Sequence, residues 1–207
     1  MRVLALSAPQ MHDAGAALAI VCMAGVVLMV AARLVPVGPS FHFLDVLHRY
    51  QLALAALVAA TATLGSLWFS ESSAGWSPCR FCWFQRIFMY SAAVVLIVAA
   101  FRRDRGARWY VVPLAGIGSL LSIWHILLEH RVIEESTTCS SLTSCATPNY
   151  VSFGRLEFNA DGQFISSGFP ITLAVMALSA FAAIIALLLA PEPLVGDDAE
   201  MHPAPAT

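Results

Sequence analysis

Five long apolar runs, separated by short polar segments, constrain the fold of this chain more than any other feature. A helix needs about 20 mostly apolar residues to cross a bilayer, so each run predicts one transmembrane helix. The rest of the composition agrees, because 59% of the 207 residues are hydrophobic and only 12% are charged. A soluble domain would need more charged surface. The runs cover approximately residues 14–35, 50–69, 83–101, 110–129 and 168–190.

We therefore predict an all-α membrane protein: a four-helix transmembrane bundle core, one extra N-terminal transmembrane helix, and an outer loop that bears cysteines. Residues 1–49 should hold the extra helix and a cytoplasmic link, and 50–190 the bundle with its outer loop at 130–167. Residues 191–207 should form a disordered cytoplasmic tail. The first run could instead be a signal peptide, but it is long and only Arg2 precedes it, which favours a retained helix.

The arginines predict how the helices are oriented. The chain has no lysine, and the short link between the third and fourth runs is rich in arginine. Short loops rich in Lys or Arg stay in the cytoplasm, so the segment before the third run and the 130–167 loop should face outward. The net charge of −2 argues against a nucleic-acid partner, because neutralising phosphates needs clustered cations. The arginines of that link are Arg102, Arg103, Arg105 and Arg108.

Four of the five cysteines form two pairs, Cys79 with Cys82 and Cys139 with Cys145, and both pairs are predicted on the outer side. Paired thiols in an oxidising compartment indicate disulfide chemistry. Cys22 lies in the middle of the first run, where a cysteine usually acts as a small buried hydrophobe.

The four outer cysteines allow several interpretations. Structural disulfides are the plainest. A zinc site is disfavoured because the second pair, CSSLTSC, has five intervening residues, more than the usual two to four. A haem-attachment motif needs His after the second cysteine, and position 83 is Trp. The remaining interpretation is a thiol relay, and we predict no metal site.

The stretch SPCRFCWFQR favours the relay. Ser77 can cap a helix and Pro78 suits its first position, which puts Cys79 in the first turn and Cys82 about one turn further. Backbone N–H groups and the helix dipole stabilise a thiolate there. Arg86 follows Cys82 by four residues, so its fixed charge could stabilise that thiolate or an anionic ligand. Alternatively, Arg86 could reach toward lipid headgroups.

Four motifs together resemble the bacterial disulfide-bond formation protein B family (DsbB), particularly its short BdbC-like branch. The resemblance covers approximately residues 64–189. It implies an enzyme of the bacterial inner membrane with both cysteine pairs on the periplasmic side. Such enzymes re-oxidise a thioredoxin-like, DsbA-like dithiol partner, pass the electrons to ubiquinone or menaquinone, and so drive disulfide formation in exported proteins. The motifs are GSLWFSE, PCRFCWFQRIFMY, SIWHILLEH and CSSLTSC.

The resemblance also implies residue roles. Cys79 and Cys82 would form the quinone-facing disulfide, with Cys82 contacting the quinone ring and Arg86 holding the quinone. Cys139 and Cys145 would be the outer pair: the partner attacks Cys139, and Cys145 exchanges with Cys79.

Some relatives carry a histidine near the quinone at a position like that of His125 or His130. The sequence does not choose between the two, and an interfacial structural histidine is equally consistent with it. A histidine there could supply protons to the reduced quinone. Glu129 is interpreted as the polar end of the fourth helix.

Two segments depart from the family pattern: the first run with its link at 33–49, and residues 154–168. The second contains an NADG turn between Leu-Glu-Phe and Gln-Phe-Ile, which predicts a short hairpin, with a solvated lid or a membrane-lying segment as alternatives. Two other functions remain open. One is a reductase that exports electrons to outer thiols, and the other is a non-enzymatic protein whose disulfides brace its loops.

Overall fold

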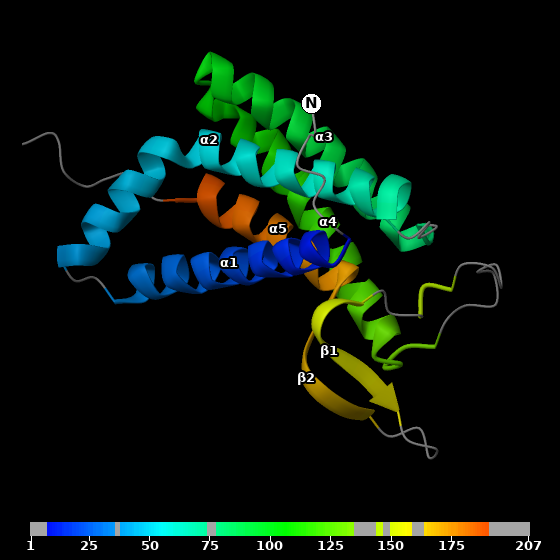
Figure 1. Cartoon of the computed structure of the whole chain (residues 1–207). Coiled ribbons are helices and arrows are strands. Elements are labelled where there is room, and N and C mark those ends of the chain that lie inside the picture. The colour runs from blue at the N-terminus through cyan, green and yellow to red at the C-terminus, as the bar shows by residue number, and fades with distance from the viewer. Residues whose placement is uncertain are drawn as a thin grey trace, which may run out of the picture.

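The chain folds into a bundle of α-helices with one β-hairpin at its end (Figure 1). The structure is a computed structural model, and it describes residues 8–35, 38–73, 78–134, 144–146, 150–158 and 164–190. The predicted tail at 191–207 lies outside these residues. The described helices are α1 (Ala8–Leu34), α2 (Gly38–Trp68), α3 (Arg80–Arg102), α4 (Arg108–Glu129) and α5 (Leu173–Leu188), with a π-helical turn at Phe69–Ser73 and a 3₁₀ turn at Arg105–Ala107.

Helices α1 to α4 are each long and apolar enough to cross a membrane. The 23 residues of α3 span about 34 Å at the usual helical rise, slightly more than the roughly 30 Å hydrocarbon core. Large apolar side chains such as Val21, Leu57, Val94 and Leu120 are well exposed on the outside of the bundle. A water-soluble protein rarely exposes so much apolar surface, whereas lipid covers it readily. The predicted all-α, multi-pass membrane fold is confirmed.

Small residues let the helices pack closely in the centre of the bundle. Alanines of α2, α3 and α4, among them Ala55, Ala92 and Ala115, are fully buried. Phe181 of α5 lies against Gly118 of α4, where an added Cβ would come within 2.3 Å of the Phe181 ring. Close approach at small residues is typical of helix packing in membranes, where burial from water offers no driving force.

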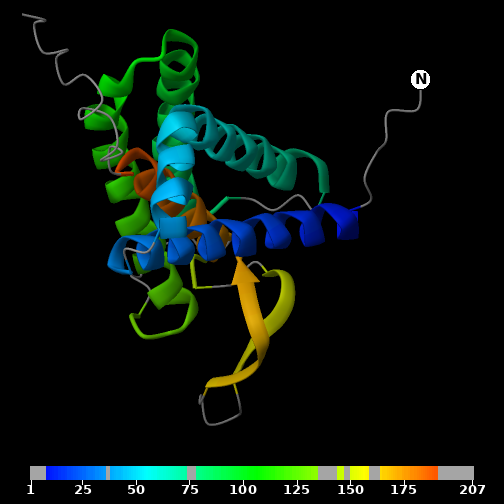
Figure 2. The same cartoon turned by 90° about the vertical axis from the view of Figure 1, so that its left-hand side faces the viewer.

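The extra helix α1 packs beside α5 and contacts β1, and the hairpin extends below α1 in the view of Figure 2. Ala16 and Ala19 join a buried cluster with Phe69, Val151 and Ile171. The link between the first two helices is shorter than the predicted 33–49, because α2 begins at Gly38 and only a few residues separate it from α1. Its cytoplasmic location stays a prediction. Pro39 falls in the first turn of α2, where a missing N–H is tolerated, so it starts the helix rather than breaking it.

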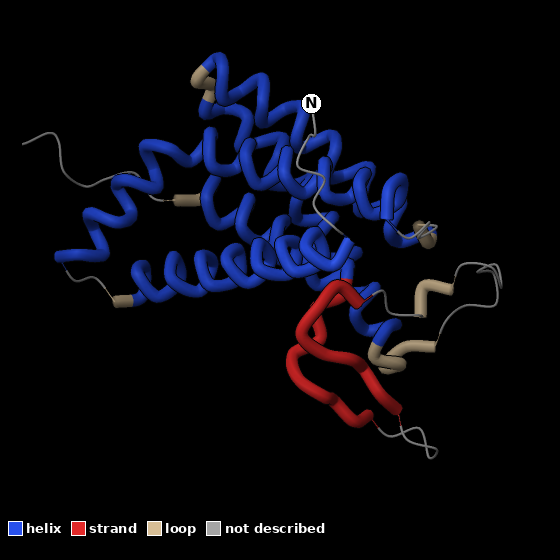
Figure 3. Tube along the Cα trace, in the orientation of Figure 1, coloured by secondary structure: helices blue, strands red, loops and turns tan. Residues whose placement is uncertain are grey.

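The predicted hairpin is confirmed: β1 (Tyr150–Phe158) pairs antiparallel with β2 (Phe164–Thr172) (Figure 3). Its predicted NADG turn at 159–162 lies outside the described residues. The strands continue further than expected, until Tyr150 pairs with Thr172. The segment between α4 and α5 therefore ends at 172, whereas the sequence predicted its end at 167. Helix α5 starts at Leu173 rather than near 168 and has 16 residues. Thr172 causes this boundary, because its Oγ1 accepts a hydrogen bond from the N–H of Val175, 3.4 Å away, and so caps α5.

The opposite end of α5 is capped by side chains from α1 and α2. Arg33 donates to the carbonyls of Ala186, at 3.4 Å, and of Leu189. His48 Nδ1 lies 3.3 Å from the carbonyl oxygen of Ala190. The last carbonyls of a helix have no partner within it, so these side chains satisfy them inside the bundle.

Candidate redox site

The site is built at the first turn of α3, and its cap differs from the prediction. The helix begins at Arg80, with Cys79 as its N-cap, so Ser77 as cap and Pro78 as first residue were wrong; Ser77 lies outside the described residues. Cys79 has extended backbone angles, and its sulfur accepts a hydrogen bond from the N–H of Cys82 at 3.4 Å. The thiol thus takes the capping role that serine usually has. Cys82 consequently lies in the first turn.

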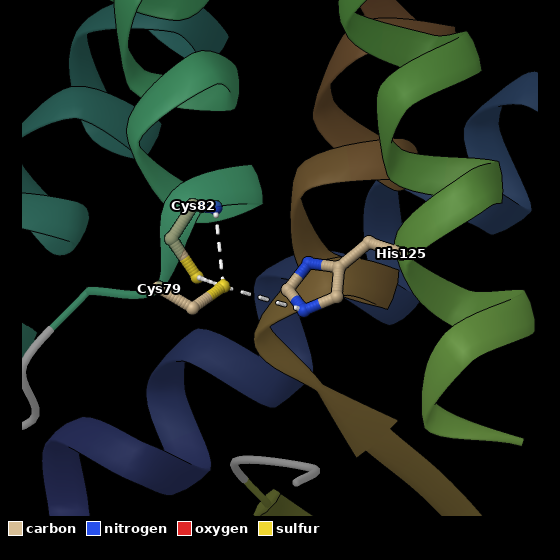
Figure 4. Close-up of side chains that lie close together, drawn as sticks. All are labelled: Cys79, Cys82 and His125. Atoms are coloured by element: carbon tan, nitrogen blue, oxygen red, sulfur yellow. Dashed lines mark hydrogen bonds between the residues drawn. The ribbon is translucent and has the colours of Figure 1, made fainter. Parts of the chain in front are cut away.

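The two thiols lie together (Figure 4). Cys79 donates its S–H to the sulfur of Cys82, 3.2 Å away. Only 5% of Cys79 is exposed, whereas Cys82 is partly exposed. The hydrogen bond to Cys82, together with burial, raises the pKa of Cys79 to about 12. Cys79 therefore holds its proton, while the sulfur of Cys82 is the acceptor in the turn where helix N–H groups favour a thiolate.

Cys145 comes to the same place from the segment between α4 and the hairpin. It is 1% exposed and packs against Cys79 and Leu128. Burial raises the pKa of the Cys145 thiol, and the backbone N–H groups of Phe81 and Arg80 act in the opposite direction. Three sulfurs therefore meet at the start of α3. Cys139 lies outside the described residues.

His125 faces the thiol pair from α4 (Figure 4). Its Nε2 lies 3.7 Å from the sulfur of Cys79, and its Nδ1 lies 3.4 Å from the amide nitrogen of Gln85. The ring stacks on Phe81, with centroids 5.8 Å apart and 27° between the planes. His130 differs, because its Nδ1 bonds to the carbonyl of Ile126 in its own helix, at 2.8 Å. The structure thus separates the two histidines that the sequence left equivalent.

Glu129 is the last residue of α4, as predicted from the sequence, but it is also a buried member of this site. It is 1% exposed, and its Oε2 accepts a 2.7 Å hydrogen bond from the hydroxyl of Thr172. Its Oε1 lies 4.0 Å from Nε2 of His125. Sequence reasoning missed Glu129, Gln85 and Thr172. The four-residue spacing of His125 and Glu129 was the available signal.

Arg86 is held by the end of α2. Its Nε donates to Ser66 Oγ at 2.9 Å, and its Nη2 donates to the Ser66 carbonyl at 2.7 Å and to Ser70 Oγ. Its guanidinium lies 5.3 Å from the centre of the Trp83 ring. Within the described part of the chain, these hydrogen bonds leave Nη1 available as a donor. This tethering contradicts a side chain that simply extends toward headgroups. The serines of GSLWFSE were not predicted as contacts.

The site offers groups that suit an aromatic carbonyl ligand. Arg86 lies one turn after the partly exposed Cys82, and the neighbouring Trp83 is 54% exposed on the outside of the bundle. A cation with a spare N–H donor beside an exposed aromatic ring fits a quinone that approaches from the lipid. Cys79, Cys82 and His125 also place three possible metal-ligand atoms within 4.8 Å of one another, although these atoms already hydrogen-bond among themselves.

Together, the fold and site define a multi-pass helical membrane protein with a buried dithiol at one end of its bundle. The model of one family, described as disulfide bond formation protein DsbB, matches residues 48–191. The chain therefore belongs to the DsbB family. The described site residues lie within the matched region, whereas α1 precedes it.

Curated relatives agree with this family. A probable disulfide formation protein of Deinococcus radiodurans is 41% identical over 140 residues, which cover 67% of this chain and 86% of the relative. Disulfide bond formation protein C of Bacillus subtilis is 38% identical over 131 residues, covering 62% and 83% of the two chains. Probable disulfide formation protein C 2 of Bacillus cereus is 35% identical over 115 residues, covering 54% and 79%. No solved structure matches this chain.

Proposed function

We propose that the protein is a quinone-dependent thiol oxidase of the bacterial inner membrane. It re-oxidises a thioredoxin-like, DsbA-like dithiol protein on the extracytoplasmic side and passes two electrons to ubiquinone or menaquinone. Membership of the DsbB family and the names of its relatives support a role in disulfide formation. The thioredoxin-like partner and the quinone are what the resemblance to this family implies.

The position of Cys79 between two other sulfurs is the observation that carries this proposal. Cys82 lies 3.2 Å from it within the same turn, and Cys145 packs against it from the segment between α4 and the hairpin. Thiol–disulfide exchange is attack by a thiolate on a disulfide sulfur, so the sulfurs must be adjacent. Cys79 can therefore form a disulfide either with Cys82 of the inner pair or with Cys145 of the outer pair.

The relay begins with both pairs oxidised. A partner thiolate attacks Cys139, breaks the Cys139–Cys145 bond and releases Cys145 as a thiolate. Cys145 then attacks Cys79, forming a Cys79–Cys145 bond and releasing Cys82 as a thiolate. The second partner thiol displaces Cys139, and the partner leaves as a disulfide. Cys139 then attacks Cys145, which restores the outer disulfide and releases Cys79.

At this stage two electrons and two protons from the partner have been transferred to the inner pair. When bound, the quinone would supply an acceptor for both electrons and both protons, which no side chain provides. Arg86 would hold its oxygen through Nη1, with the Ser66 and Ser70 contacts fixing the guanidinium. The start of α3 would stabilise Cys82 as a thiolate.

The proposal is tested with the full-length protein in lipid nanodiscs, supplied with a reduced thioredoxin-like partner and ubiquinone or menaquinone. We expect one quinone reduced for each partner disulfide formed, measured by quinone absorbance and thiol alkylation. Cys82→Ser should lower turnover at least 1,000-fold, since this residue transfers the electrons (about 4 kcal/mol). Cys22→Ala, in the middle of α1, is the matched control and should turn over normally.

Near wild-type turnover by Cys82→Ser would overturn the proposal. Alkylation of intact cells separates the other two functions. Both pairs resting as thiols would indicate a reductase, and disulfides that never exchange with a dithiol protein would indicate a bracing role.

A further inference from the structure

We propose that His125 is the acid–base residue of Cys79. It accepts the thiol proton when Cys79 closes the disulfide with Cys82, and it returns a proton when Cys79 is released from Cys145. This inference rests on the proposed function and adds to it a catalytic residue for the inner pair. It also changes the expectation for His125, which the sequence connected with the quinone.

The geometry places one imidazole nitrogen at the thiol and holds the ring by its other side. Nε2 lies 3.7 Å from the Cys79 sulfur, within reach of a sulfur hydrogen bond. Gln85 contacts Nδ1 at 3.4 Å, and Phe81 stacks on the ring face. Nε2 can accept a proton only in the tautomer that carries the hydrogen on Nδ1, and Gln85 supports this tautomer when its amide presents the oxygen rather than the nitrogen to Nδ1. In that arrangement the ring can gain and lose a proton at Nε2 without moving.

Cys79 needs a base to become a nucleophile, more than Cys82 does. Its thiol is buried and donates to Cys82, and its pKa is raised to about 12. Only a thiolate attacks a disulfide sulfur efficiently, so a Cys79 that keeps its proton is inert at neutral pH. A base that removes this proton as the S–S bond forms makes Cys79 a nucleophile.

Glu129 and Thr172 are positioning residues for this histidine. The Glu129 carboxyl lies 4.0 Å from Nε2, where it can pair with the imidazolium that forms on proton uptake. Thr172 donates to the other carboxyl oxygen at 2.7 Å while it caps α5. The titratable groups that face the ring or its thiol partner are Cys79 and Cys82 of the α3 start, Glu129 of α4, and Cys145 of the segment between α4 and the hairpin.

In the closing step Cys82 is first bonded to an oxidant, which in the assay below is one half of 4,4′-dipyridyl disulfide. The S–H bond of Cys79 breaks and its proton moves to Nε2 of His125. The Cys79–Cys82 bond forms, the bond between Cys82 and the oxidant breaks, and the oxidant leaves with the electron pair.

The test measures this closure without quinone or partner. Cys22→Ala, Cys139→Ser and Cys145→Ser together leave the inner pair as the remaining cysteines of the chain. The reduced protein is mixed with excess 4,4′-dipyridyl disulfide, and thiopyridone release is followed by absorbance. The first phase depends on reagent concentration because it is the attack on the exposed thiol. The second does not, because it is closure by Cys79.

We expect His125→Gln in this background to slow closure about 100-fold at pH 7, a typical contribution of general acid–base catalysis. Its residual rate should rise tenfold per pH unit, since the thiolate fraction of Cys79 increases up to its pKa of about 12. With His125 present, the rate should depend less steeply on pH, because the imidazole takes the proton of Cys79 as the S–S bond forms. Glu129→Gln should slow closure less, about tenfold, because the imidazolium that forms loses its carboxyl partner.

His42→Gln, on the exposed start of α2, is the matched control and should close at the parent rate. A second variant, His125→Ala, should regain rate when free imidazole is added, which a purely structural defect would not do. The inference is overturned if His125→Gln closes within twofold of the parent with an unchanged pH profile, or if imidazole gives no rescue. Failure of the full-length protein to oxidise a partner with quinone would instead contradict the proposed function.

Discussion

Each end of the bundle buries a histidine, and the two histidines have different neighbours. His125, 3% exposed, lies between a thiol and a carboxyl at the start of α3. His48, 5% exposed, contacts a backbone carbonyl at the end of α5. Burial alone therefore does not identify a functional histidine. The chemistry of the contacting group does, because a thiol exchanges protons whereas a carbonyl only accepts a hydrogen bond.

Two arginines at the two ends of the bundle also differ in the groups that they contact. Arg33 donates its hydrogen bonds to the last carbonyls of α5 and so caps that helix. Arg86 is tethered by two serines beside the thiols, with a donor left for a ligand. We expect changes at the α3 start to alter chemistry with little effect on stability, and changes at the α5 carboxyl end to do the reverse.

The largest effect on stability is expected at the contact between α4 and α5, the helices that connect the two ends of the bundle. Gly118→Ala should lower the free energy of unfolding by about 3 kcal/mol, because the new methyl would overlap the Phe181 ring at 2.3 Å. Unfolding in a denaturing-detergent titration measures this. Gly116→Ala is the control, since no atom lies within 4 Å of its added Cβ. Equal stability of the two variants would show that this contact does not order the bundle.

Arg86→Gln should reduce kcat/KM for quinone about 100-fold, because a charged donor is lost (about 2.7 kcal/mol). Steady-state quinone reduction measures this change. Thermal unfolding, measured in parallel, should show that the variant is about as stable as the parent. Arg33→Gln serves as the control at the other end. A normal kcat/KM for Arg86→Gln would remove the distinction between the two arginines.

Thr172→Val should destabilise the protein by about 1–2 kcal/mol and slow closure of the inner disulfide several-fold, since Glu129 loses its donor and α5 its cap. Thermal unfolding and the thiopyridone assay measure the two effects. Thr63→Val is the matched control: within the described residues, Thr63 Oγ1 is buried with no hydrogen-bond partner, so this change should be neutral or stabilising. If the two variants have the same stability and the same closure rate, the Thr172–Glu129 hydrogen bond contributes to neither.

The smallest effect is expected for Arg33→Gln by itself. It should lower stability by about 0.5–1 kcal/mol, the usual value of a favourable charge at a helix carboxyl terminus, and leave closure unchanged. Thermal unfolding at low and high salt would detect it. If Arg33→Gln slowed closure of the Cys79–Cys82 disulfide, the two ends of the bundle would be coupled, and the difference between them described above would not hold.

The sequence alone determined the features that depend on neighbours along the chain. The lengths of the apolar runs predicted the membrane helices, and the alternation around the NADG turn predicted the hairpin. The spacing from Cys79 to Arg86 predicted a helix start with the arginine one turn after Cys82. Local patterns suffice here because helix and hairpin periodicities depend on nearby residues.

Only the tertiary structure decided which polar groups meet. Cys79 and His125 are 46 residues apart, and Glu129 and Thr172 are 43 apart, so no periodicity connects them. The packing of α4 between α3 and α5 brings them together and buries Glu129. It also distinguishes His125 from His130. Five residues of helix place the two about 140° apart around the axis, so His125 faces the thiols while Nδ1 of His130 contacts the carbonyl of Ile126 in its own helix.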